Sequence, residues 1–459
     1  MYSKPRLPEF RVSPSPDIDF PEVWCRFIDD TLPQWVKNRY SPNPRWKDKP
    51  FSMEDVKFFI PSIRNLSDLF TRQLGRSPGA YFQQARFRSA YLLYFLPLQA
   101  SKFISLFCQH PEALRAALAH GRETNVLRIA DLGSGPATAS LAFLAWLAEI
   151  PEAAGKSENA KGIPPKIVFH LYDRDKAILQ DGKDLLLEMA QAIPKLKNRV
   201  EVITRVSDWR EASRNLPDEI SIAFFGHVLN ETTERAGKHF TLENSSGGAS
   251  LSGDAEETAL SSLWTSVSKK VRGGGILIVE PATRQNSQHL CWLRDRFIKE
   301  GLIAPEATSL WGPCLHAGSC PLGQGRDWCH FSTPVQFPGK WFRAFSRGLA
   351  TEREWVKYTY LWLASPDYPS PAPDPSLRRV VSDPLGDGRD EVLLCEPAAA
   401  HAPRRLHVMS KLLRGSIIEM IEREAPKPQN PTRPQRSEGR PQKPLRKILP
   451  VTKRKISKK

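Results

Sequence analysis

The sequence predicts an α/β protein built around a mostly parallel β-sheet. Between residues 122 and 301, five short apolar segments alternate with segments of helical pattern. Apolar strands that alternate with helices are typical of a parallel sheet covered by helices on both faces. Helical spacing precedes this part and short apolar runs follow it. With 40% hydrophobic and 25% charged residues, the composition is that of a globular protein.

The first 121 residues contain no strand pattern. Residues 1–50 are rich in proline and aromatic residues, and we expect an extended N-terminal segment that wraps the surface. Residues 51–121 space their apolar positions three and four apart, which predicts a helical N-terminal domain. Because proline lacks the amide hydrogen, Pro61 and Pro97 are expected to interrupt these helices.

Residues 122–301 carry the predicted sheet, with a polar insertion at 151–165 and a low-complexity loop at 237–256. Each predicted strand is followed by a loop and a helical segment, so consecutive strands are expected to run parallel. The predicted strands lie in "VLRIADLGSG", "IVFHLYDRD", "VEVITRVSDW", "ISIAFFGHVLN" and "GGILIVEP".

The C-terminal third divides into two parts of different composition. Residues 302–424 hold three closely spaced cysteines among short apolar runs, which predicts a small, loop-rich, partly β domain held together by a bound metal. Residues 425–459 contain twelve Lys and Arg residues and one acid, so they supply +11 of the net charge of +16. We expect a disordered basic tail that binds nucleic acid, and favour this over a merely solubilising tail.

Three observations bear on the compartment. No apolar run approaches the roughly 20 residues of a membrane span. The N-terminal residues resemble neither a secretory signal nor a transit peptide, and seven cysteines, an odd number, argue against a secreted disulfide framework. We therefore expect a monomer without membrane association in a bacterial cytoplasm, with a mitochondrial matrix as the alternative.

The segment "ADLGSGPATAS" places a glycine loop directly after the first predicted strand. Glycines allow the backbone to turn sharply and to approach a ligand closely. The dinucleotide pattern G-x-G-x-x-G/A fails, because its last position is Thr138. The methyltransferase pattern D/E-x-G-x-G-x-G fits Asp131, Gly133 and Gly135, with Ala137 in place of the last glycine. We expect the extra methyl group of Ala137 to narrow the loop.

Polar residues follow the later strands at the edge where such sheets bind ligands. Asp173 could accept hydrogen bonds from a ribose, and Asp208 could lie near an adenine, although each could instead cap a helix or turn. Together with the glycine loop they favour an S-adenosylmethionine-binding, class I methyltransferase-like (Rossmann-like) sheet. His227 or Glu231 could act as a general base, but a hydrogen-bonded polar group at a strand end is favoured, so the sequence identifies no catalytic residue.

Cysteines at C-x5-C-x8-C spacing form the most unusual segment of the chain. Structural zinc sites usually use pairs of C-x2–4-C, whereas a four-iron cluster accepts thiolates from looser loops. Cys314, Cys320 and Cys329 therefore favour a [4Fe-4S] cluster, and Cys395 in "DEVLLCEP" is the best candidate for the fourth ligand.

The sequence also allows other metal sites, and three further cysteines lie outside this segment. A Cys3His zinc site that uses His316 or His330 competes with the cluster, and a group of unliganded thiols is the least favoured alternative. Cys25, Cys108 and Cys291 lie in apolar helical segments and are expected to be small buried hydrophobic residues.

The motifs together resemble a known family. "DLGSGPATAS", "HVLNE", "ILIVEP", "PCLHAGSCPL", "DWCHFS" and Cys395 are similar to the methyltransferase-like proteins of the mitochondrial small ribosomal subunit and their bacterial relatives. The resemblance covers roughly residues 55–410, and the cysteine segment is its most specific part. Leu315 stands where the family often has proline.

This resemblance implies a small-subunit assembly or translation factor that binds ribosomal RNA on a methyltransferase-like scaffold. It implies a [4Fe-4S] cluster on Cys314, Cys320, Cys329 and Cys395, and ribosomal RNA and the small ribosomal subunit as partners. The alternatives are an active S-adenosylmethionine-dependent ribosomal RNA methyltransferase and a zinc-binding RNA-binding protein. A radical enzyme is disfavoured because the motif C-x3-C-x2-C is missing from the sequence.

Overall fold

The computed structural model places residues 1–421 in one compact unit and residues 422–459 in a second. The predicted tail at 425–459 and the loop at 237–256 lie outside the described residues, as does most of the insertion at 151–165. The structure describes residues 10–13, 18–42, 44–72, 81–150, 162–229, 263–303, 309–323, 327–335, 339–351, 353–396, 403–408 and 412–421.

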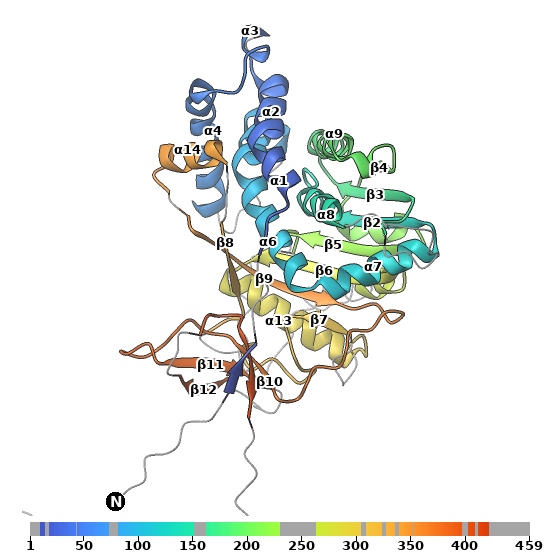
Figure 1. Cartoon of the computed structure of the whole chain (residues 1–459), viewed down its shortest axis with the longest axis vertical. Coiled ribbons are helices and arrows are strands. Elements are labelled where there is room, and N and C mark those ends of the chain that lie inside the picture. The colour runs from blue at the N-terminus through green and yellow to red at the C-terminus, as the bar shows by residue number, and fades with distance from the viewer. Residues whose placement is uncertain are drawn as a thin grey trace, which may run out of the picture. The chain divides into compact units, whose positions relative to one another are not determined.

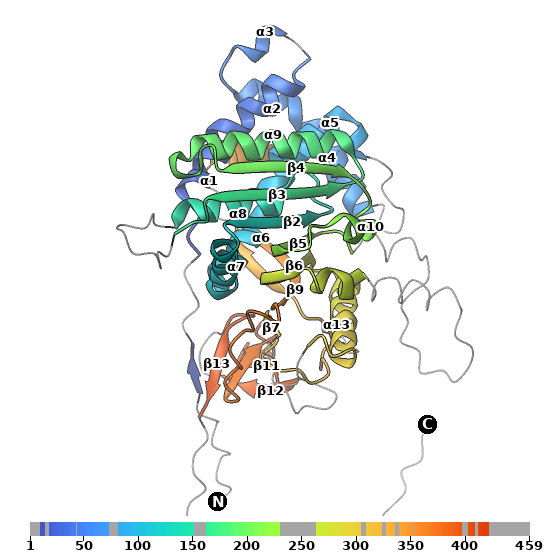
Figure 2. The same ribbon diagram turned by 90° about the vertical axis from the view of Figure 1, so that its right-hand side faces the viewer.

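An eight-stranded sheet forms the centre of this unit, in the order β4-β3-β2-β5-β6-β9-β7, and β8 also pairs with β9 (Figure 2). The first five strands in this order are parallel, and β9 runs antiparallel to its three neighbours. The strands are β2 (Val126–Leu132), β3 (Lys166–Asp173), β4 (Val200–Val206), β5 (Ile220–Gly226), β6 (Val271–Pro281), β7 (Leu310–Gly312), β8 (Phe331–Pro334) and β9 (Trp355–Leu363).

This strand order is that of a doubly wound fold. The chain moves outward from β2 to β4 and then returns to the other side of β2 at β5. The loops after β2 and β5 therefore leave in opposite directions, and ligands bind in the crevice between them. With the antiparallel β9 beside β6, the arrangement is that of a class I methyltransferase-like sheet. The predicted α/β fold is confirmed, and the metal-binding character of the C-terminal part remains a prediction.

Both faces of the sheet are buried, as the apolar strands predict. In β5, Phe224 packs into one core with Phe103, Phe107 and Phe143, whereas the next residue, Phe225, packs into the opposite core. The first core includes α6 (Leu96–Gln109), α7 (Pro111–Glu123), α8 (Thr138–Glu149) and α9 (Lys176–Ala192), and the second includes α10 (Trp209–Ala212), a helical segment at 263–268 and α13 (Arg284–Lys299).

Residues 1–50 differ from the predicted extended segment, because their middle is helical. Buried apolar residues recur every four positions at Trp24, Ile28, Leu32 and Val36, and they pack into the first core. That spacing places them on one helical face. The helices are α1 (Glu22–Arg26), the π-helical turn η1 (Phe27–Thr31), α2 (Leu32–Tyr40) and α3 (Pro44–Lys47).

The prolines of the helical part do not break it as predicted. Helix α4 (Met53–Arg72) continues through Pro61. The bond that Pro61 removes would end on the carbonyl of Lys57, which is exposed, so water can satisfy that group. Helix α5 (Ala85–Ala90) leads through the π-helical turn η3 (Tyr91–Phe95) into α6, with Pro97 in the first turn of α6.

One helical run of the described chain, Ala85–Gln109, is long and apolar enough to cross a membrane by length and composition. Of its most apolar window, 83% is buried inside the protein. Its side chains, among them Phe103 and Phe107, pack against the sheet. The run is therefore the central core helix of this fold.

A second, five-stranded antiparallel sheet has the order β1-β13-β10-β11-β12. Its first strand comes from the N-terminal segment and pairs with β13, so that Phe10 lies opposite Met420. Its core contains Val380, Val392 and Leu406. The strands are β1 (Phe10–Val12), β10 (Leu377–Val380), β11 (Glu391–Cys395), β12 (Arg404–His407) and β13 (Ile417–Met420).

The predicted domain boundary at residue 301 differs from this topology. Strands β7, β8 and β9 follow residue 301 yet complete the large sheet. The run "KYTYLWLAS" forms most of β9, and its Tyr360 and Trp362 are buried in the first core. A single apolar run does not show which sheet it joins, because that choice depends on partners distant in sequence.

A buried ion pair joins the N-terminal helices. Lys37 Nζ lies 2.8 Å from Asp55 Oδ2, and the two side chains are 3% and 4% exposed. We expect Asp55→Ala to lower the free energy of unfolding by about 3–5 kcal/mol, because it leaves Lys37 buried without its counter-ion. Glu22→Ala is the control, since it removes an exposed pair with Arg26 and should cost less than about 1 kcal/mol. Urea unfolding followed by tryptophan fluorescence would test this, and equal shifts would contradict it.

Candidate functional site

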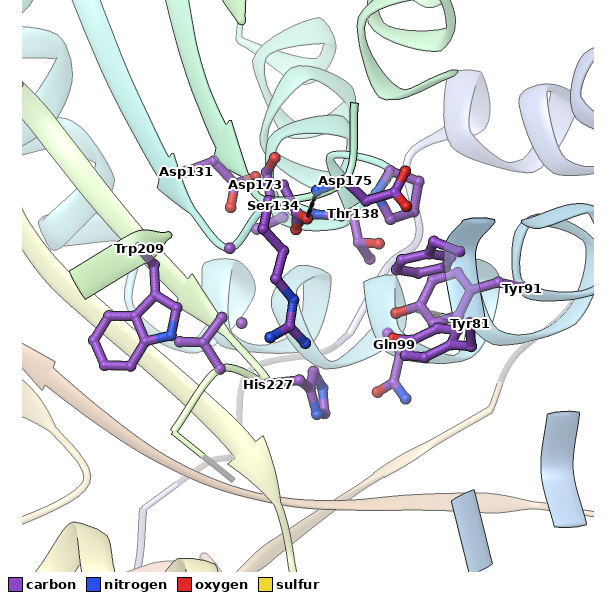
Figure 3. A pocket seen from close by; sticks show the side chains of 18 of the residues that line it. Tyr81, Tyr91, Gln99, Asp131, Ser134, Thr138, Asp173, Asp175, Trp209 and His227 are labelled. Atoms are coloured by element: carbon purple, nitrogen blue, oxygen red, sulfur yellow. Dashed lines mark hydrogen bonds between the residues drawn. The ribbon is translucent and has the colours of Figure 1, made fainter. Parts of the chain in front are cut away.

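A cavity of about 240 Å³ lies at the carboxyl ends of β2 and β5, at the switch point of the sheet. Figure 3 shows Asp131 and Asp173 along one side of it, Trp209 and the aromatic pair Tyr81 and Tyr91 at opposite ends, and His227 between these ends. The loops at the strand ends thus form one part of the cavity wall, and the N-terminal helical part forms the rest. From that part, Tyr81, Phe82, Gln83, Tyr91, Gln99 and Phe103 line the cavity.

The glycine loop after β2 is fastened to the neighbouring strand. The amides of Gly133 and Ser134 both donate to the carbonyl of Tyr172, at 2.8 and 2.9 Å. Gly133 has a φ of +70°, and a Cβ there would lie 2.0 Å from Cγ1 of Val228. Only glycine fits this position, because any side chain would be strained and would overlap the loop after β5.

Ala137 takes the position of the last glycine in the motif, with a left-handed φ of 61°. This conformation costs an alanine roughly 1–2 kcal/mol. The residue is fully buried and does not line the cavity. A Cβ added to Gly182 of α9 would lie 3.1 Å from the Ala137 methyl, so that methyl faces α9. The expected narrowing of the ligand loop is therefore not seen. Gly182 in α9 has no side chain, which leaves space for the Ala137 methyl on the side away from the cavity.

Asp131 and Asp173 both support the loop through hydrogen bonds. Asp131 Oδ2 accepts from the hydroxyl and the amide of Ser140 in α8, at 2.7 and 3.3 Å. Burial raises the pKa of Asp131 to about 7. Asp173 accepts from the amides of Gly135 and Asp175, each at 2.9 Å. Both carboxyl groups border the cavity while they hold its walls.

Asp208 is held by the arginine two residues later. Its two oxygens accept from Nε and a terminal nitrogen of Arg210, at 2.8 and 2.7 Å, and this pairing lowers the pKa of Asp208. Trp209 is 5% exposed and packs edge to face on Phe225. The pair therefore offers a fixed aromatic ring and a fixed carboxylate to the cavity, where an adenine was predicted.

A pair of polar side chains, of which the sequence indicated His227 but not Lys102, lies at the carboxyl end of β5. His227 lines the cavity in a left-handed conformation, with a φ of 61°. Its Nε2 lies 3.3 Å from Nζ of Lys102, which is 3% exposed, and burial lowers the pKa of this lysine to about 7. The carboxylate of Glu280 acts against that shift. His227 thus has a partner, as favoured from the sequence. Burial and the charge of Lys102 lower the pKa of His227 well below its usual value, so its ring is neutral.

The four predicted cysteine ligands come together where the large and small sheets meet. Cys314 follows β7, Cys329 precedes β8, and Cys395 ends β11. Cys320, Cys329 and Cys395 pack against one apolar group of Leu322, Val381 and Leu393. Burial raises the pKa of Cys329 well above its usual value, and the charges of Cys320, Cys314 and Cys395 raise it further.

Cys291 joins this group from α13, which the sequence did not predict. Its Sγ lies 3.3 Å from Sγ of Cys320, and this hydrogen bond lowers the pKa of Cys320. Cys291 is 7% exposed, as expected of a buried small residue. Helical spacing alone does not show that α13 turns this thiol towards a loop some thirty residues later.

Two histidines and two arginines surround the thiols. Nε2 of His316 lies 3.2 Å from Sγ of Cys395, whereas Nδ1 of His330 donates to the carbonyl of Trp328. Arg294 is 2% exposed and Arg379 is 8% exposed. The Nε atoms of both arginines are buried without a hydrogen-bond partner in the described structure. Two such cations beside several thiols favour a negatively charged group between them.

In the part of the chain that the structure describes, no group of three or more His, Cys, Asp or Glu side chains converges closely enough to hold a metal ion. The sulfur atoms of Cys291 and Cys320 are in contact, and Cys395 contacts His316 instead of another thiol. The predicted metal site of Cys314, Cys320, Cys329 and Cys395 therefore remains a prediction.

Residues 248–416 match the family model described as "Mitochondrial small ribosomal subunit Rsm22". This match confirms the family resemblance. It spans over a third of the chain and includes all four predicted cysteine ligands, whereas the glycine loop lies before it. The Rsm22 match thus rests on the later strands and the cysteine segment. A comparison with curated proteins gives no match.

Solved structures with low similarity include an O-methyltransferase family protein from Burkholderia thailandensis (12% identity, 68% of this chain and 72% of that chain, TM-score 0.28). A second is an S-adenosylmethionine-dependent methyltransferase from Thiobacillus denitrificans in complex with S-adenosyl-L-homocysteine (13%, 56% and 91%, TM-score 0.24). A third is the O-methyltransferase TomG from Streptomyces achromogenes (12%, 65% and 96%, TM-score 0.21). At these scores the assignment of the fold rests on the strand order of the chain itself.

The glycine loop offers a test of the cavity. We expect Gly133→Ala to weaken S-adenosylmethionine binding by about tenfold or more, a loss of roughly 1.4 kcal/mol, because the new methyl group displaces Val228. Gly301→Ala is the matched control, since its φ is also positive (+75°) but no atom lies within 4 Å of the new Cβ. Titration calorimetry would measure both affinities. Equal losses, or tight binding by Gly133→Ala, would show that the ligand does not use this loop.

Proposed function

We propose that this protein is an assembly or translation factor of the small ribosomal subunit that binds ribosomal RNA as a monomer on a methyltransferase-like scaffold. The observation that carries the proposal is the Rsm22 match, whose printed description names the mitochondrial small ribosomal subunit. The basic tail at 425–459 supports an RNA partner, because twelve cations and one acid suit a phosphate backbone. The family name also favours the mitochondrial alternative over the bacterial cytoplasm.

The cavity at the switch point is proposed to bind S-adenosylmethionine. Asp131, Gly133 and Gly135 would form its loop, and the backbone there can approach the ligand because a positive φ at Gly133 keeps the loop tight. Asp173 and Asp208 would receive the ribose and the adenine, and Trp209 offers a ring for stacking. When bound, the cofactor would supply an activated methyl group.

The four clustered cysteines, Cys314, Cys320, Cys329 and Cys395, are proposed to hold a [4Fe-4S] cluster. Thiolates are the ligands that such clusters use. The fit is supported by the packing of Cys320, Cys329 and Cys395 on one apolar group and by the buried arginines beside them. Cys3His zinc binding remains the alternative, because His316 contacts Cys395 directly. In either case the metal would bind the small sheet to the large one.

A second candidate function is an active ribosomal RNA methyltransferase. One observation favours it: His227 is held in a left-handed conformation at the cavity, beside the buried Lys102. Non-glycine residues in this conformation cluster at functional sites, because the surrounding structure must stabilise them. A neutral imidazole there could hydrogen-bond to the amino or hydroxyl group that accepts the methyl and orient it, although its lowered pKa makes it a weak base.

Ultraviolet crosslinking in cells, with mapping of the crosslinked nucleotides, tests the partner. We expect crosslinks concentrated on small-subunit ribosomal RNA, because the Lys and Arg residues of the basic tail are proposed to contact the phosphate backbone of that RNA. A chain that ends at residue 424 is the matched variant, and its crosslinks should keep their positions at lower yield. Crosslinks spread over messenger and transfer RNA alone, or none above background, would contradict the proposed function.

Iron content tests the metal proposal. Protein purified without oxygen should carry about four irons per chain. Cys395→Ser should lose the iron, because it removes a proposed ligand. Cys291→Ser should keep it, because Cys291 is not a proposed ligand and a serine hydroxyl can still hydrogen-bond with Cys320. Cys108→Ser is the control outside the group. Stoichiometric zinc without visible absorption would contradict the cluster, and loss of iron in Cys291→Ser but not in Cys395→Ser would contradict the fourth ligand.

A further inference from the structure

Helix α14 (Lys340–Gly348) has one apolar face and one basic face. Its buried Phe342 stacks on Tyr94 of η3, with ring centroids 5.1 Å apart, and Figure 1 shows the helix beside α4. Lys340, Arg343 and Arg347 are exposed, and their spacing of three and four residues places them on the opposite face. The packed face fixes the helix, so that the three cations form a rigid row.

The basic row lines a groove of about 530 Å³. Arg353 lines it from the chain that leads into β9, and Glu354 is the only acid among the described residues that line it. In the described part of the chain, Lys340, Arg347 and Arg353 form no ion pair with an acidic side chain. Four cations and one acid therefore line the described part of the groove, and the carboxylate of Asp29 interacts with two of the cations, Lys340 and Arg343. The lining still carries more positive than negative charge.

The groove lies at the same edge of the sheet as the cavity. Pro281 at the carboxyl end of β6 pairs with Tyr358, so the residues before β9 extend past the edge where ligands bind. Turn η3 lies between the two sites, because Tyr91 lines the cavity while Tyr94 stacks on Phe342, which lines the groove. A chain that occupies the groove would thus pass beside the cavity.

We propose that this groove binds the phosphate backbone of structured RNA and guides it past the cavity; the proposal rests on the ribosomal RNA partner proposed above. Rows of Lys and Arg on a fixed helix are typical of phosphate contacts, which orient a nucleic acid without reading its sequence. Trp355 starts β9 directly after Arg353 and Glu354, and it is 49% exposed. An exposed ring beside a basic groove offers a stacking surface for an unpaired base. An acidic peptide would use the charges but not the ring, so RNA is favoured.

The test is the salt dependence of RNA binding. We expect the triple variant Lys340→Gln, Arg347→Gln, Arg353→Gln, made in the full chain, to bind transcribed small-subunit ribosomal RNA about tenfold more weakly or worse. The slope of log affinity against log salt should fall by about two to three, because each lost phosphate contact removes nearly one released counter-ion. Thermal unfolding should be unchanged, since all three side chains are exposed.

The matched control removes three exposed cations elsewhere, with Arg26→Gln, Arg115→Gln and Lys166→Gln. It should keep the affinity within about twofold and the slope within about one. If the wild type binds with a steep slope and the groove variant equals it, the groove proposal is overturned while the RNA partner stands. If the wild type does not bind this RNA, or binds only acidic ribosomal protein peptides, both proposals fail.

Discussion

Three backbone amides after β2 donate to β3: those of Gly133 and Ser134 bond to the carbonyl of Tyr172, and that of Gly135 bonds to the carboxylate of Asp173. These bonds fix the turn that starts α8 and forms one wall of the cavity. The turn must be this tight, because the loop after β5 leaves no space for a side chain at Gly133. The loops of the two halves of the doubly wound sheet therefore contact each other at Gly133 and Val228.

The parts that could be predicted from the sequence are those with local signals. The five parallel strands show as apolar runs between helices, and the glycine loop shows as a motif at a strand end. The walls of the cavity could not be predicted in the same way, because Tyr81 and Gln99 come from helices that precede the sheet. Lys102 reads as one charge in an apolar helix, and only its contact with His227 shows that it borders the site. The placement of β9 likewise depends on long-range pairing.

The cysteine region shows how two weak signals combine. The spacing of Cys314, Cys320 and Cys329 suggested a metal, and the small sheet brings Cys395 to the same place. The structure adds the buried cations, which no spacing rule reveals because Arg294 and its thiol neighbours come from different segments. In a medium of low polarity such cations stabilise anionic groups strongly, so the chemistry of this region depends on charge as well as on sulfur.

The pairing of Phe10 with Met420 has a consequence for synthesis. A ribosome makes the chain from its beginning, so β1 must wait until nearly all described residues have been added before its partner strand exists. The large sheet needs nothing after Leu363 and can close earlier. The small sheet, and with it the arrival of Cys395 among the other thiols, is thus a late event of maturation. A complete small sheet can therefore form only in a molecule that has been synthesised as far as β13.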